Sequence, residues 1–407
     1  MSSPKTILLT AYDVDPFKGG ESAVGWNIAL QAARNFDVIL ITRENNRTNI
    51  EKYVAHRGRH KRIQFEYFDL PYLFRFWKRG ARGSSLYFYL WQMTLPIVIW
   101  YREYLFDASH SVNFVSDSFP AFLWVLRKPF IWGPVSHHEK IARSFILFYG
   151  VSAYIRDRFT WLVKLFLWNV DPFLRVTKVR SSKILTGNQS VPLRLNLDAN
   201  KFKKFPSSAI DCLPSESIRS QSDVFNILVV SRLAPIKSVD VCILAFEKFS
   251  ADNPSVDAKL NIVGSGPFSE VLKGLARQTF CGERILFHGN ISFGELESYY
   301  SEASLYLSAS HEGGGMSVVE ALSHGLPVIC FDNYGPGESV DDLSGFRIKI
   351  TDRDGAIKDF SACLTDVCVN DDLRRNMSLN ARQRVRDNYL WSHRGDTLKE
   401  IYDQVIE

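Results

Sequence analysis

Short apolar runs alternate with longer segments of helical periodicity along most of the chain. In the N-terminal half, runs of β-branched and other apolar residues predict strands at residues 6–10, 37–42, 64–68, 112–115, 129–132 and 183–186. The segments between them carry helical patterns, for example at residues 24–34 and 86–105. This alternation predicts parallel sheets assembled from strand–helix–strand units.

The pattern breaks off at residues 206–223, which are rich in Ser, Pro and Asp and have no sustained period. We expect a linker there, because such segments commonly join domains. A second series follows, with strands predicted at residues 225–230, 260–263, 284–288, 305–308 and 328–331, and helices at 238–250, 269–278, 295–301 and 316–324. The last helices are expected from about residue 371 to residue 407.

The fold class predicted from these patterns is α/β, with two Rossmann-like, doubly wound parallel-sheet domains. The chain of 407 residues is long enough for two cores. We expect an N-terminal domain at residues 1–205, a C-terminal domain at 224–385, and a final helix at 386–407 that packs back on the first domain. Ligands of such folds bind outside the carboxyl ends of the strands. Two facing domains would therefore hold a ligand in the cleft between them.

Composition and charge are those of an ordinary globular protein, with 46% hydrophobic and 23% charged residues. The N-terminus lacks the apolar core and cleavage site of a signal peptide, so we expect a cytoplasmic protein. The net charge is only +5, but residues 57–82 are rich in Arg, Lys and aromatic residues. Such a segment suits phospholipid headgroups or phosphates, and a solvated basic face is the alternative. No nucleic-acid-binding motif is recognised, and no nucleic-acid partner is expected.

Two apolar segments were compared with the pattern of a membrane span. Residues 83–101 carry no charge, but their polar residues and a proline are poor for a bilayer core, so we expect a buried or interfacial helix. Residues 141–176 are aromatic and apolar but contain several charged residues. That pattern favours an amphipathic surface helix.

The first motif with chemical meaning is residues 231–238, Ser-Arg-Leu-Ala-Pro-Ile-Lys-Ser, between a predicted strand and a predicted helix. Arg232 and Lys237 should therefore lie at the carboxyl edge of the sheet, near a helix N-terminus. Two cations and the positive end of a helix dipole favour a phosphate-bearing ligand. Taken alone, the segment is equally compatible with surface charges on a loop.

A second loop, Gly264-Ser265-Gly266-Pro267, also follows a predicted strand. Its glycines permit a tight turn and a close approach of the backbone to a ligand. Ser269 stands where a dinucleotide-binding fingerprint needs its third glycine, so this motif is weak by itself.

The strongest motif spans residues 310–321, Ser-His-Glu-Gly-Gly-Gly-Met-Ser-Val-Val-Glu-Ala. Its three glycines follow a strand and open a helix at about Met316, so the backbone N–H groups of Gly314 to Ser317 should form an anion site. Glu312 in the loop and Glu320 in the helix flank the same N-terminal cavity, and carboxylates accept hydrogen bonds from sugar hydroxyls. A phosphate on the N–H groups and hydroxyls on the carboxylates together describe a sugar nucleotide.

This segment resembles the Glu-x7-Glu motif of the retaining glycosyltransferases of family 4, which have the two-domain GT-B fold. The two upstream loops fall in the family's order. The N-terminal half is similar to a branch that acts in bacterial surface-polysaccharide synthesis, and the resemblance covers nearly the whole chain. The similar pieces are Lys18-Gly19-Gly20-Glu21 with Gly25-Trp26-Asn27, residues 42–46 (Thr-Arg-Glu-Asn-Asn), 129–135 (Pro-Phe-Ile-Trp-Gly-Pro-Val) and 333–338 (Asn-Tyr-Gly-Pro-Gly-Glu).

The resemblance implies a role for each motif residue. Arg232 and Lys237 would hold the donor diphosphate. Glu320 would bind the ribose, and Glu312 the hydroxyls of the transferred sugar. The other donor contacts it implies are Gly19, Gly20, Gly264, Gly266, Gly313, Gly314, Gly315, Met316 and Ser317. The family needs no metal or cofactor, so cations and a helix dipole must stabilise the leaving diphosphate. It retains the anomeric configuration, with front-face attack and transfer of the acceptor's proton to the leaving phosphate.

The chain departs from the family at three places. Gly313 to Gly315 form the loop in which many members have a bulky residue. Ser238 follows the lysine, where many members have glycine. Residues 136–139, Ser-His-His-Glu, replace a glycine run of the polysaccharide branch. Other members place a histidine there on the transferred sugar, so His137 or His138 is expected to contact the sugar, and a structural histidine is the alternative.

The expected activity is transfer of a hexose from a nucleoside-diphosphate sugar to a glycan acceptor. We expect a lipid-linked acceptor and peripheral contact with the anionic inner face of the cell membrane. Two other functions are compatible with the fold. One is a sugar-nucleotide 2-epimerase, and the other is a non-catalytic scaffold that binds a nucleotide sugar.

Overall fold

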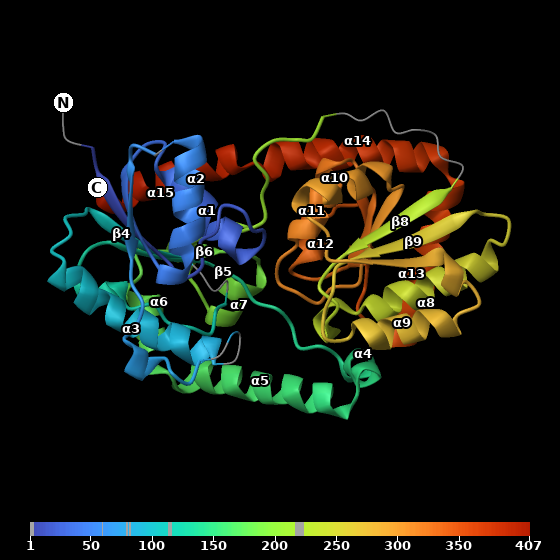
Figure 1. Ribbon diagram of the computed structural model, residues 1–407, viewed down its shortest axis with the longest axis horizontal. Helices are drawn as coiled ribbons and strands as arrows, with labels where there is room; N and C mark the ends of the chain where they lie inside the picture. Colours follow the sequence, from blue (N-terminus) through green and yellow to red (C-terminus); the bar gives the residue numbers. More distant parts are fainter. Residues whose placement is uncertain (1–3, 59, 79, 81–82, 113–115, 216–223) are drawn as a thin grey trace. The chain divides into compact units, whose positions relative to one another are not determined.

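A computed structural model of the chain describes residues 4–58, 60–78, 80, 83–112, 116–215 and 224–407. The chain divides into two compact units (Figure 1). The first consists of Met1–His137, Leu162–Ser207 and Trp391–Glu407, and the second of His138–Trp161 and Ser208–Leu390. In the described ranges, no helix combines the length and the apolar character needed to cross a membrane.

The first unit contains a parallel sheet with the order β3-β2-β1-β4-β5-β6-β7. β1 pairs with β2 on one side and with β4 on the other, so the order of the chain reverses between β1 and β4. Such a switch point is where α/β sheets bind ligands. The strands are β1 (Thr6–Ala11), β2 (Asp37–Thr42), β3 (Ile63–Tyr67), β4 (Ala108–Val112), β5 (Phe130–Val135), β6 (Lys183–Thr186) and β7 (Phe202–Lys204).

Helices cover both faces of this sheet (Figure 1). The apolar side of α3 packs Trp91 and Leu95 into one core with Leu8 and Ile41 of the strands. The final helix, α15, belongs to this unit, as the sequence predicted, and its Tyr402 hydroxyl lies 2.7 Å from Nδ1 of the buried His110. The helices are α1 (Glu21–Ala32), α2 (Arg47–Arg57), α3 (Ser84–Tyr101), α6 (Pro172–Arg180), α7 (Ser190–Leu195) and α15 (Trp391–Ile406).

The second unit repeats this topology with the sheet order β10-β9-β8-β11-β12-β13. β8 lies between β9 and β11, so the switch point falls between β8 and β11. Its strands are β8 (Phe225–Val230), β9 (Ala258–Val263), β10 (Ile285–Gly289), β11 (Leu305–Ser308), β12 (Val328–Phe331) and β13 (Gly345–Ile348).

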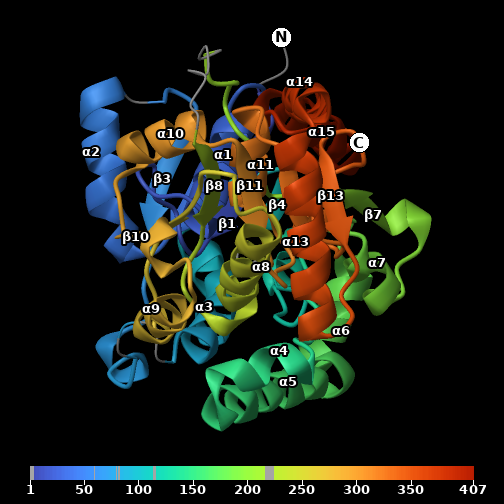
Figure 2. The same ribbon diagram turned by 90° about the vertical axis from the view of Figure 1, so that its right-hand side faces the viewer.

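The central strands β11 and β12 of the second sheet are buried along their whole length, which is why they are short, largely apolar runs. Ile227 and Leu307 face a core that includes α8 and α13, which lie side by side (Figure 2). Leu228 and Tyr306 face the opposite core, with α11 and α14. The helices of this unit are α4 (Arg143–Ile146), α8 (Val239–Asp252), α9 (Ser269–Gln278), α10 (Phe293–Glu302), α11 (Met316–Ser323), α12 (Pro336–Ser339), α13 (Arg353–Val369) and α14 (Asp371–Asn388).

The observed units differ from the predicted domains in one long segment, residues 138–161, which we call the excursion. Residues 138–161 were expected in the first domain but belong to the second unit, and α5 (Val151–Val170) runs from one unit into the other. Phe145 and Ile146 of α4 are buried in the core of the second unit, which explains this assignment. The predicted linker, residues 206–223, is described only in part, because residues 216–223 lie outside the described residues. Within it, the N–H of Ile210 donates to Tyr389 O at 2.9 Å, and both residues belong to the second unit.

Three strands depart from the sequence-based boundaries. β4 occupies Ala108–Val112 rather than the predicted 112–115, of which 113–115 lie outside the described residues. Its sequence, Ala-Ser-His-Ser-Val, did not predict a buried strand because fully buried strands are rarely so polar. Burial is possible here because both ring nitrogens of His110 have hydrogen-bond partners, the Tyr402 hydroxyl and the Gly133 carbonyl. The short strands β7 and β13 were not predicted.

Candidate active site

The two strongest motifs follow neighbouring strands at the switch point of the second unit. Residues 231–238 follow β8, and residues 310–315 follow β11, which pairs with β8. Lys237 Nζ lies 2.6 Å from Glu312 Oε2, and the N–H of His311 donates to Ile236 O at 2.8 Å. A charge-assisted bond and a backbone bond therefore join the loops at the place where open α/β sheets bind ligands.

A contact between His311 and Ser238 also joins the two loops. Nε2 of His311 lies 3.2 Å from the Ser238 hydroxyl, and burial lowers the pKa of His311 to about 4, so the ring is neutral at physiological pH. Ser238 has a φ of 40°, a left-handed conformation that glycine adopts more easily. Phe145, from the excursion, packs its ring edge-on against His311 with centroids 5.0 Å apart. The excursion thus packs against His311, the residue before Glu312.

The Gly264–Gly266 loop holds the Arg232 loop in place. A Cβ on Gly264 would lie 2.0 Å from Ser231 O, and one on Gly266 would lie 2.3 Å from Leu233 O. The N–H of Leu233 donates to Ser265 O at 2.9 Å. These glycines are therefore explained by close contact with the neighbouring backbone, and their contact with a donor stays a prediction. Arg232 is exposed and makes no ion pair in the described part of the chain.

The Glu312 loop is also held from the side of β12. The side-chain amide of Asn333 donates to Ser310 O at 2.7 Å. A Cβ on Gly335 would lie 1.9 Å from Glu312 O, so only glycine fits this approach. The Asn-Tyr-Gly-Pro segment of the sequence resemblance therefore acts as a brace for the Glu312 backbone.

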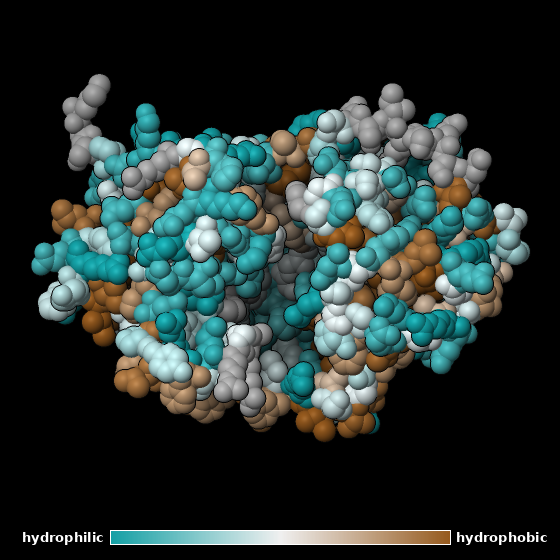
Figure 3. Space-filling view, viewed as in Figure 1, coloured by the Kyte–Doolittle hydropathy of each residue, from teal (hydrophilic) through white to brown (hydrophobic). Residues whose placement is uncertain are grey.

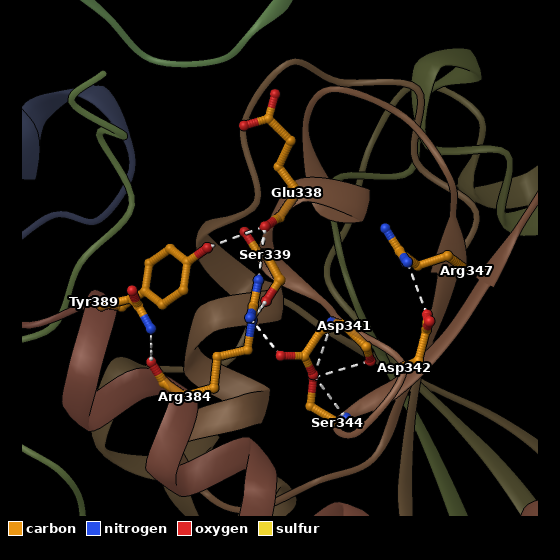
Figure 4. A network of polar contacts seen from close by, with 9 residues as sticks. Glu338, Ser339, Asp341, Asp342, Ser344, Arg347, Arg384 and Tyr389 are labelled. Carbon is orange, nitrogen blue, oxygen red and sulfur yellow. Dashed lines mark hydrogen bonds and ion pairs between the residues drawn. The ribbon is translucent and has the colours of Figure 1, made fainter. Parts of the chain in front are cut away.

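A polar network fixes the helix that follows this brace (Figure 4). Arg384 of α14 donates to the carbonyl oxygens of Ser339 at 2.6 Å and Glu338 at 3.1 Å, and it pairs with Asp341. The Tyr389 hydroxyl donates to the same Glu338 carbonyl at 3.2 Å. Figure 4 shows the Glu338 carboxylate pointing away from this network. Bonds to Arg384 and Tyr389 therefore anchor the backbone of α12.

Glu320 lies one turn into α11, on the helix that the glycine loop opens. Burial raises the pKa of Glu320, and a hydrogen bond of 2.9 Å from the Tyr300 hydroxyl lowers it. This bond orients one carboxylate oxygen. Tyr300 itself is held by stacking on His324, with ring centroids 5.1 Å apart.

The N-terminus of α11 agrees with the prediction in position. The helix begins at Met316, directly after the three glycines. One of its N–H groups is already bonded, because Gly315 donates to the Ser208 hydroxyl at 3.3 Å. The predicted contacts of Gly313, Gly314, Met316 and Ser317 with a donor phosphate are neither shown nor contradicted by this geometry.

The predicted site residues of the first half divide between the units. Gly19 and Gly20 precede α1 in the first unit, and Gly20 has a φ of 66°. His137 is 7% exposed, with Nδ1 3.2 Å from Asp117 Oδ2, and Arg194 Nε lies 3.2 Å from the same oxygen. His138 belongs to the second unit, with its ring 6.2 Å from that of Trp161. A contact of either histidine with a sugar stays a prediction.

The basic segment of the first unit contributes to a small cavity. Arg43, Arg75 and Lys78 line a volume of about 240 Å³ together with Asn45, Asp69 and Tyr87. The cavity lies where β2 and β3 end, because Arg43 follows β2 and Asp69 follows β3. Burial lowers the pKa of Lys78, and the adjacent Arg43 and Arg75 lower it further. Arg59, Arg79 and Arg82 of the basic segment lie outside the described residues.

Sequence reasoning missed the residues that position the site. Tyr300, Ser208 and Phe145 lie far from the motifs in sequence, and no local pattern signals their contacts. Asn333 could have been found, because Asn before a Gly-Pro turn commonly bonds nearby backbone. Within the described residues, no group of three or more His, Cys, Asp or Glu side chains is placed to hold a metal ion, and metal independence stays a prediction.

Comparison with known proteins finds similarity to glycosyltransferases, in sequence over the second unit and in fold over both units. Residues 215–384 match the family model of glycosyl transferases group 1. A GDP-mannose-dependent alpha-(1-6)-phosphatidylinositol monomannoside mannosyltransferase of Mycolicibacterium smegmatis is 28% identical over 184 residues, which is 43% of this chain and 47% of that protein. An alpha-monoglucosyldiacylglycerol synthase of Streptococcus pneumoniae is 25% identical over 239 residues, which is 57% of this chain and 53% of that protein. The chain thus spans only about half the length of these relatives.

The fold comparison extends over both units. The crystal structure of the pneumococcal O-GlcNAc transferase GtfA, in complex with UDP and GlcNAc, has a TM-score of 0.65 at 13% sequence identity and covers 99% of each chain. Its similarity reaches the first unit, which the family model does not match. Residues 215–384 of the second unit thus match the glycosyl transferases group 1, and both units share the fold of two Rossmann-like domains, of the GT-B type, with the pneumococcal structure.

Proposed function

We propose that the protein is a retaining, metal-independent hexosyltransferase that uses a nucleoside-diphosphate sugar. The observation that carries this proposal is the junction of Lys237 with Glu312 across the switch point, followed by Glu320 one turn into α11. It combines a cation for phosphate with two carboxylates for hydroxyls, which is the chemistry of a sugar nucleotide. The relatives support this donor class, since one is named GDP-mannose-dependent and the pneumococcal structure contains UDP.

In the proposed reaction, the acceptor hydroxyl attacks the anomeric carbon from the side of the leaving group. The bond from that carbon to the donor phosphate oxygen breaks as the bond to the acceptor oxygen forms. The acceptor's proton passes to the departing phosphate. The products are the nucleoside diphosphate and a glycosylated acceptor of unchanged anomeric configuration. Arg232 and Lys237 stabilise the charge that develops on the phosphate, and Glu312 orients the sugar.

Lys237 and Arg232 would stabilise the donor phosphate in different ways. Lys237 is positioned before the donor arrives, because Glu312 holds its amine at 2.6 Å. Arg232 is exposed, and its planar guanidinium can bind two phosphate oxygens. Together they supply the positive charge that a divalent metal supplies in other transferases.

The acceptor is proposed to carry a phosphate and a lipid, and to be reached from the inner face of the cell membrane. The cavity of Arg43, Arg75 and Lys78 supports the phosphate, since its lining has three cations and one carboxylate. Its volume of about 240 Å³ is below the roughly 300–1,000 Å³ of pockets for drug-sized ligands, so it suits a small charged group such as a phosphate. Two relatives are named for phosphatidylinositol and diacylglycerol substrates, which agrees with a lipid-linked acceptor.

The alternatives predict different products. A 2-epimerase would change the sugar without an acceptor, whereas a transferase should release free nucleoside diphosphate only when an acceptor is present. The test incubates the protein with common nucleotide sugars, with and without a bacterial membrane lipid extract, in the presence of a chelator. We expect acceptor-dependent release, lost in Glu312→Gln and kept in Arg277→Gln, an exposed arginine of α9. Release that ignores the acceptor, or a Glu312→Gln variant of full activity, would contradict the proposal.

A further inference from the structure

The outward face of α5 is apolar. Six large apolar residues repeat every three or four positions along this helix, at Val151, Ile155, Phe159, Leu162, Phe166 and Val170, and each is between 54% and 65% exposed. The spacing places them on one side of the helix. Figure 3 shows brown, apolar residues along α5 at the lower edge of the view. We call these six residues the α5 stripe.

The inward side of α5 holds three charged residues among aromatic and aliphatic ones, of which Ala153, Tyr154 and Trp168 pack against the cores. Asp157 and Arg158 pair at 3.2 Å, with their side chains only 15% and 20% exposed, and Arg158 donates to Ile141 O at 2.6 Å. Lys164 is also partly buried. A helix on the surface of a water-surrounded protein normally turns a polar face to the solvent, whereas α5 turns the apolar α5 stripe outward. The α5 stripe therefore needs an apolar environment that the chain itself does not supply.

The stripe is flanked by positive charge. Residues 140–180 contain eight Lys and Arg against two Asp, a net charge of +6, whereas the whole chain carries +5. Lys140, Arg143 and Arg156 are exposed, and both acidic residues are engaged, Asp157 by Arg158 and Asp171 as the N-cap of α6. An apolar face with basic flanks matches the interface of a bilayer that contains anionic lipids.

We propose that α5 is the membrane-docking element of this protein, and that it lies in the plane of an anionic bilayer with the α5 stripe inserted among the acyl chains. The helix does not cross the bilayer, since none of the described helices is long and apolar enough. A second copy of the chain is the weaker occupant, because two segments of net charge +6 would repel each other across the stripe. The inference deepens the proposed lipid-linked acceptor, on which it rests, by naming the surface that reaches the membrane.

The test measures binding to vesicles without any nucleotide, so that it can fail independently of the transferase reaction. The full chain is floated with vesicles of phosphatidylcholine alone, or of phosphatidylcholine with phosphatidylglycerol. The stripe variant is Ile155→Asn, Phe159→Asn and Phe166→Asn together. The matched control is Phe280→Asn, Leu343→Asn and Leu379→Asn, because these apolar residues are 64%, 64% and 70% exposed elsewhere. Both variants should stay folded, since every altered side chain is exposed, and circular dichroism checks this.

We expect the wild type, the control and the inactive Glu312→Gln protein to bind the phosphatidylglycerol vesicles alike. The stripe variant should bind at least about tenfold more weakly, since it withholds three large apolar side chains from the interface. A variant with Lys140, Arg143 and Arg156 changed to Gln should also bind less, and high salt should mimic it. No binding by the wild type, equal binding by the stripe variant, or a wild-type dimer that the stripe variant dissolves in sedimentation would overturn the proposal.

Discussion

Lys237 and Glu312, 75 positions apart in the sequence, form an ion pair of 2.6 Å between the loops that follow β8 and β11. The pair fixes both side chains before a ligand arrives, with the Lys237 side chain 15% and the Glu312 side chain 36% exposed. A donor must replace this bond, because its phosphate would bind the amine and its sugar hydroxyls would bind the carboxylate. In the proposed mechanism the same two groups would bind each other in the free protein and the donor in the complex.

This exchange predicts different effects for the two partners. Lys237→Gln should weaken binding of the nucleoside diphosphate and of its sugar conjugate by at least about tenfold, since a charge-assisted bond of roughly 1.5–3 kcal/mol is lost from both. Glu312→Gln should weaken only the sugar conjugate, and binding of the nucleoside diphosphate should be unchanged or tighter because the lysine is released. Isothermal titration of both ligands into both variants measures this. Equal losses for the two ligands in Glu312→Gln would refute the assigned role of Glu312.

The Tyr300–Glu320 bond predicts a pH effect. The hydrogen bond from Tyr300 lowers a pKa of Glu320 that burial has raised, so Tyr300→Phe should let this pKa rise further. A protonated Glu320 accepts poorly from ribose hydroxyls, so donor affinity falls as the pH falls through that pKa. In Tyr300→Phe the acid limb of the affinity profile should therefore move to higher pH. An unshifted limb would show that Glu320 does not titrate with donor binding.

Ser238 should tolerate glycine better than alanine. Its φ of 40° carries a cost of about 1–2 kcal/mol for a residue with a Cβ, and its hydroxyl bond to His311 offsets about 0.5–1.5 kcal/mol of that cost. Ser238→Ala keeps the strain and loses the bond, so it should lower the free energy of unfolding by about 1 kcal/mol. Ser238→Gly loses both and should stay near the wild-type value. Urea unfolding of the two variants compares them, and a glycine variant less stable than the alanine variant would contradict this account.

Acid should destabilise the first unit through His110. Burial lowers the pKa of His110 from 6.5 to about 4, and its two ring nitrogens bond Tyr402 and the Gly133 carbonyl. Below pH 6.5 the unfolded chain takes up a proton that the folded chain refuses, so the free energy of unfolding falls between pH 6.5 and about 4. The loss should reach up to about 3 kcal/mol and should be smaller in His110→Gln. Denaturant unfolding at several pH values measures both slopes.

The basic cavity of the first unit predicts an effect confined to the acceptor. Arg75→Gln or Lys78→Gln should raise the acceptor KM several-fold and leave the donor KM and kcat unchanged, because we propose that the cavity binds the acceptor phosphate. Arg57→Gln, an exposed cation of α2 outside the cavity lining, is the matched control. A raised donor KM in the cavity variants would instead assign the cavity to the donor.

The sequence predicted the switch-point motifs because each consists of contiguous residues between a strand and a helix. Glycines, cations and carboxylates at fixed spacing in one loop are visible without the fold. The fully buried strands β11 and β12 of the second unit were equally visible, since burial on both faces leaves nearly uninterrupted apolar runs. These local signals were sufficient for the fold class and for placing the motifs at the edge of one sheet.

The remaining features depend on packing that has no local signal. The polar sequence of β4 does not predict a buried strand, because its partners Tyr402 and Gly133 are remote. The apolar pattern of residues 138–161 does not predict which unit they belong to, because Phe145 could be buried in the core of either unit. The bond from Ser208 to Gly315 likewise joins segments 107 positions apart.

The most direct test of the central claim is titration of UDP, GDP, dTDP and ADP, each alone and as its common sugar conjugates, into the wild type in the presence of a chelator and then of magnesium. The account predicts that one nucleotide binds equally well in both conditions, and that Arg232→Gln and Lys237→Gln each weaken it at least about tenfold while Arg277→Gln does not. Failure of every nucleotide to bind the folded protein, or binding that ignores Arg232 and Lys237, would contradict a donor site at the switch point of the second unit.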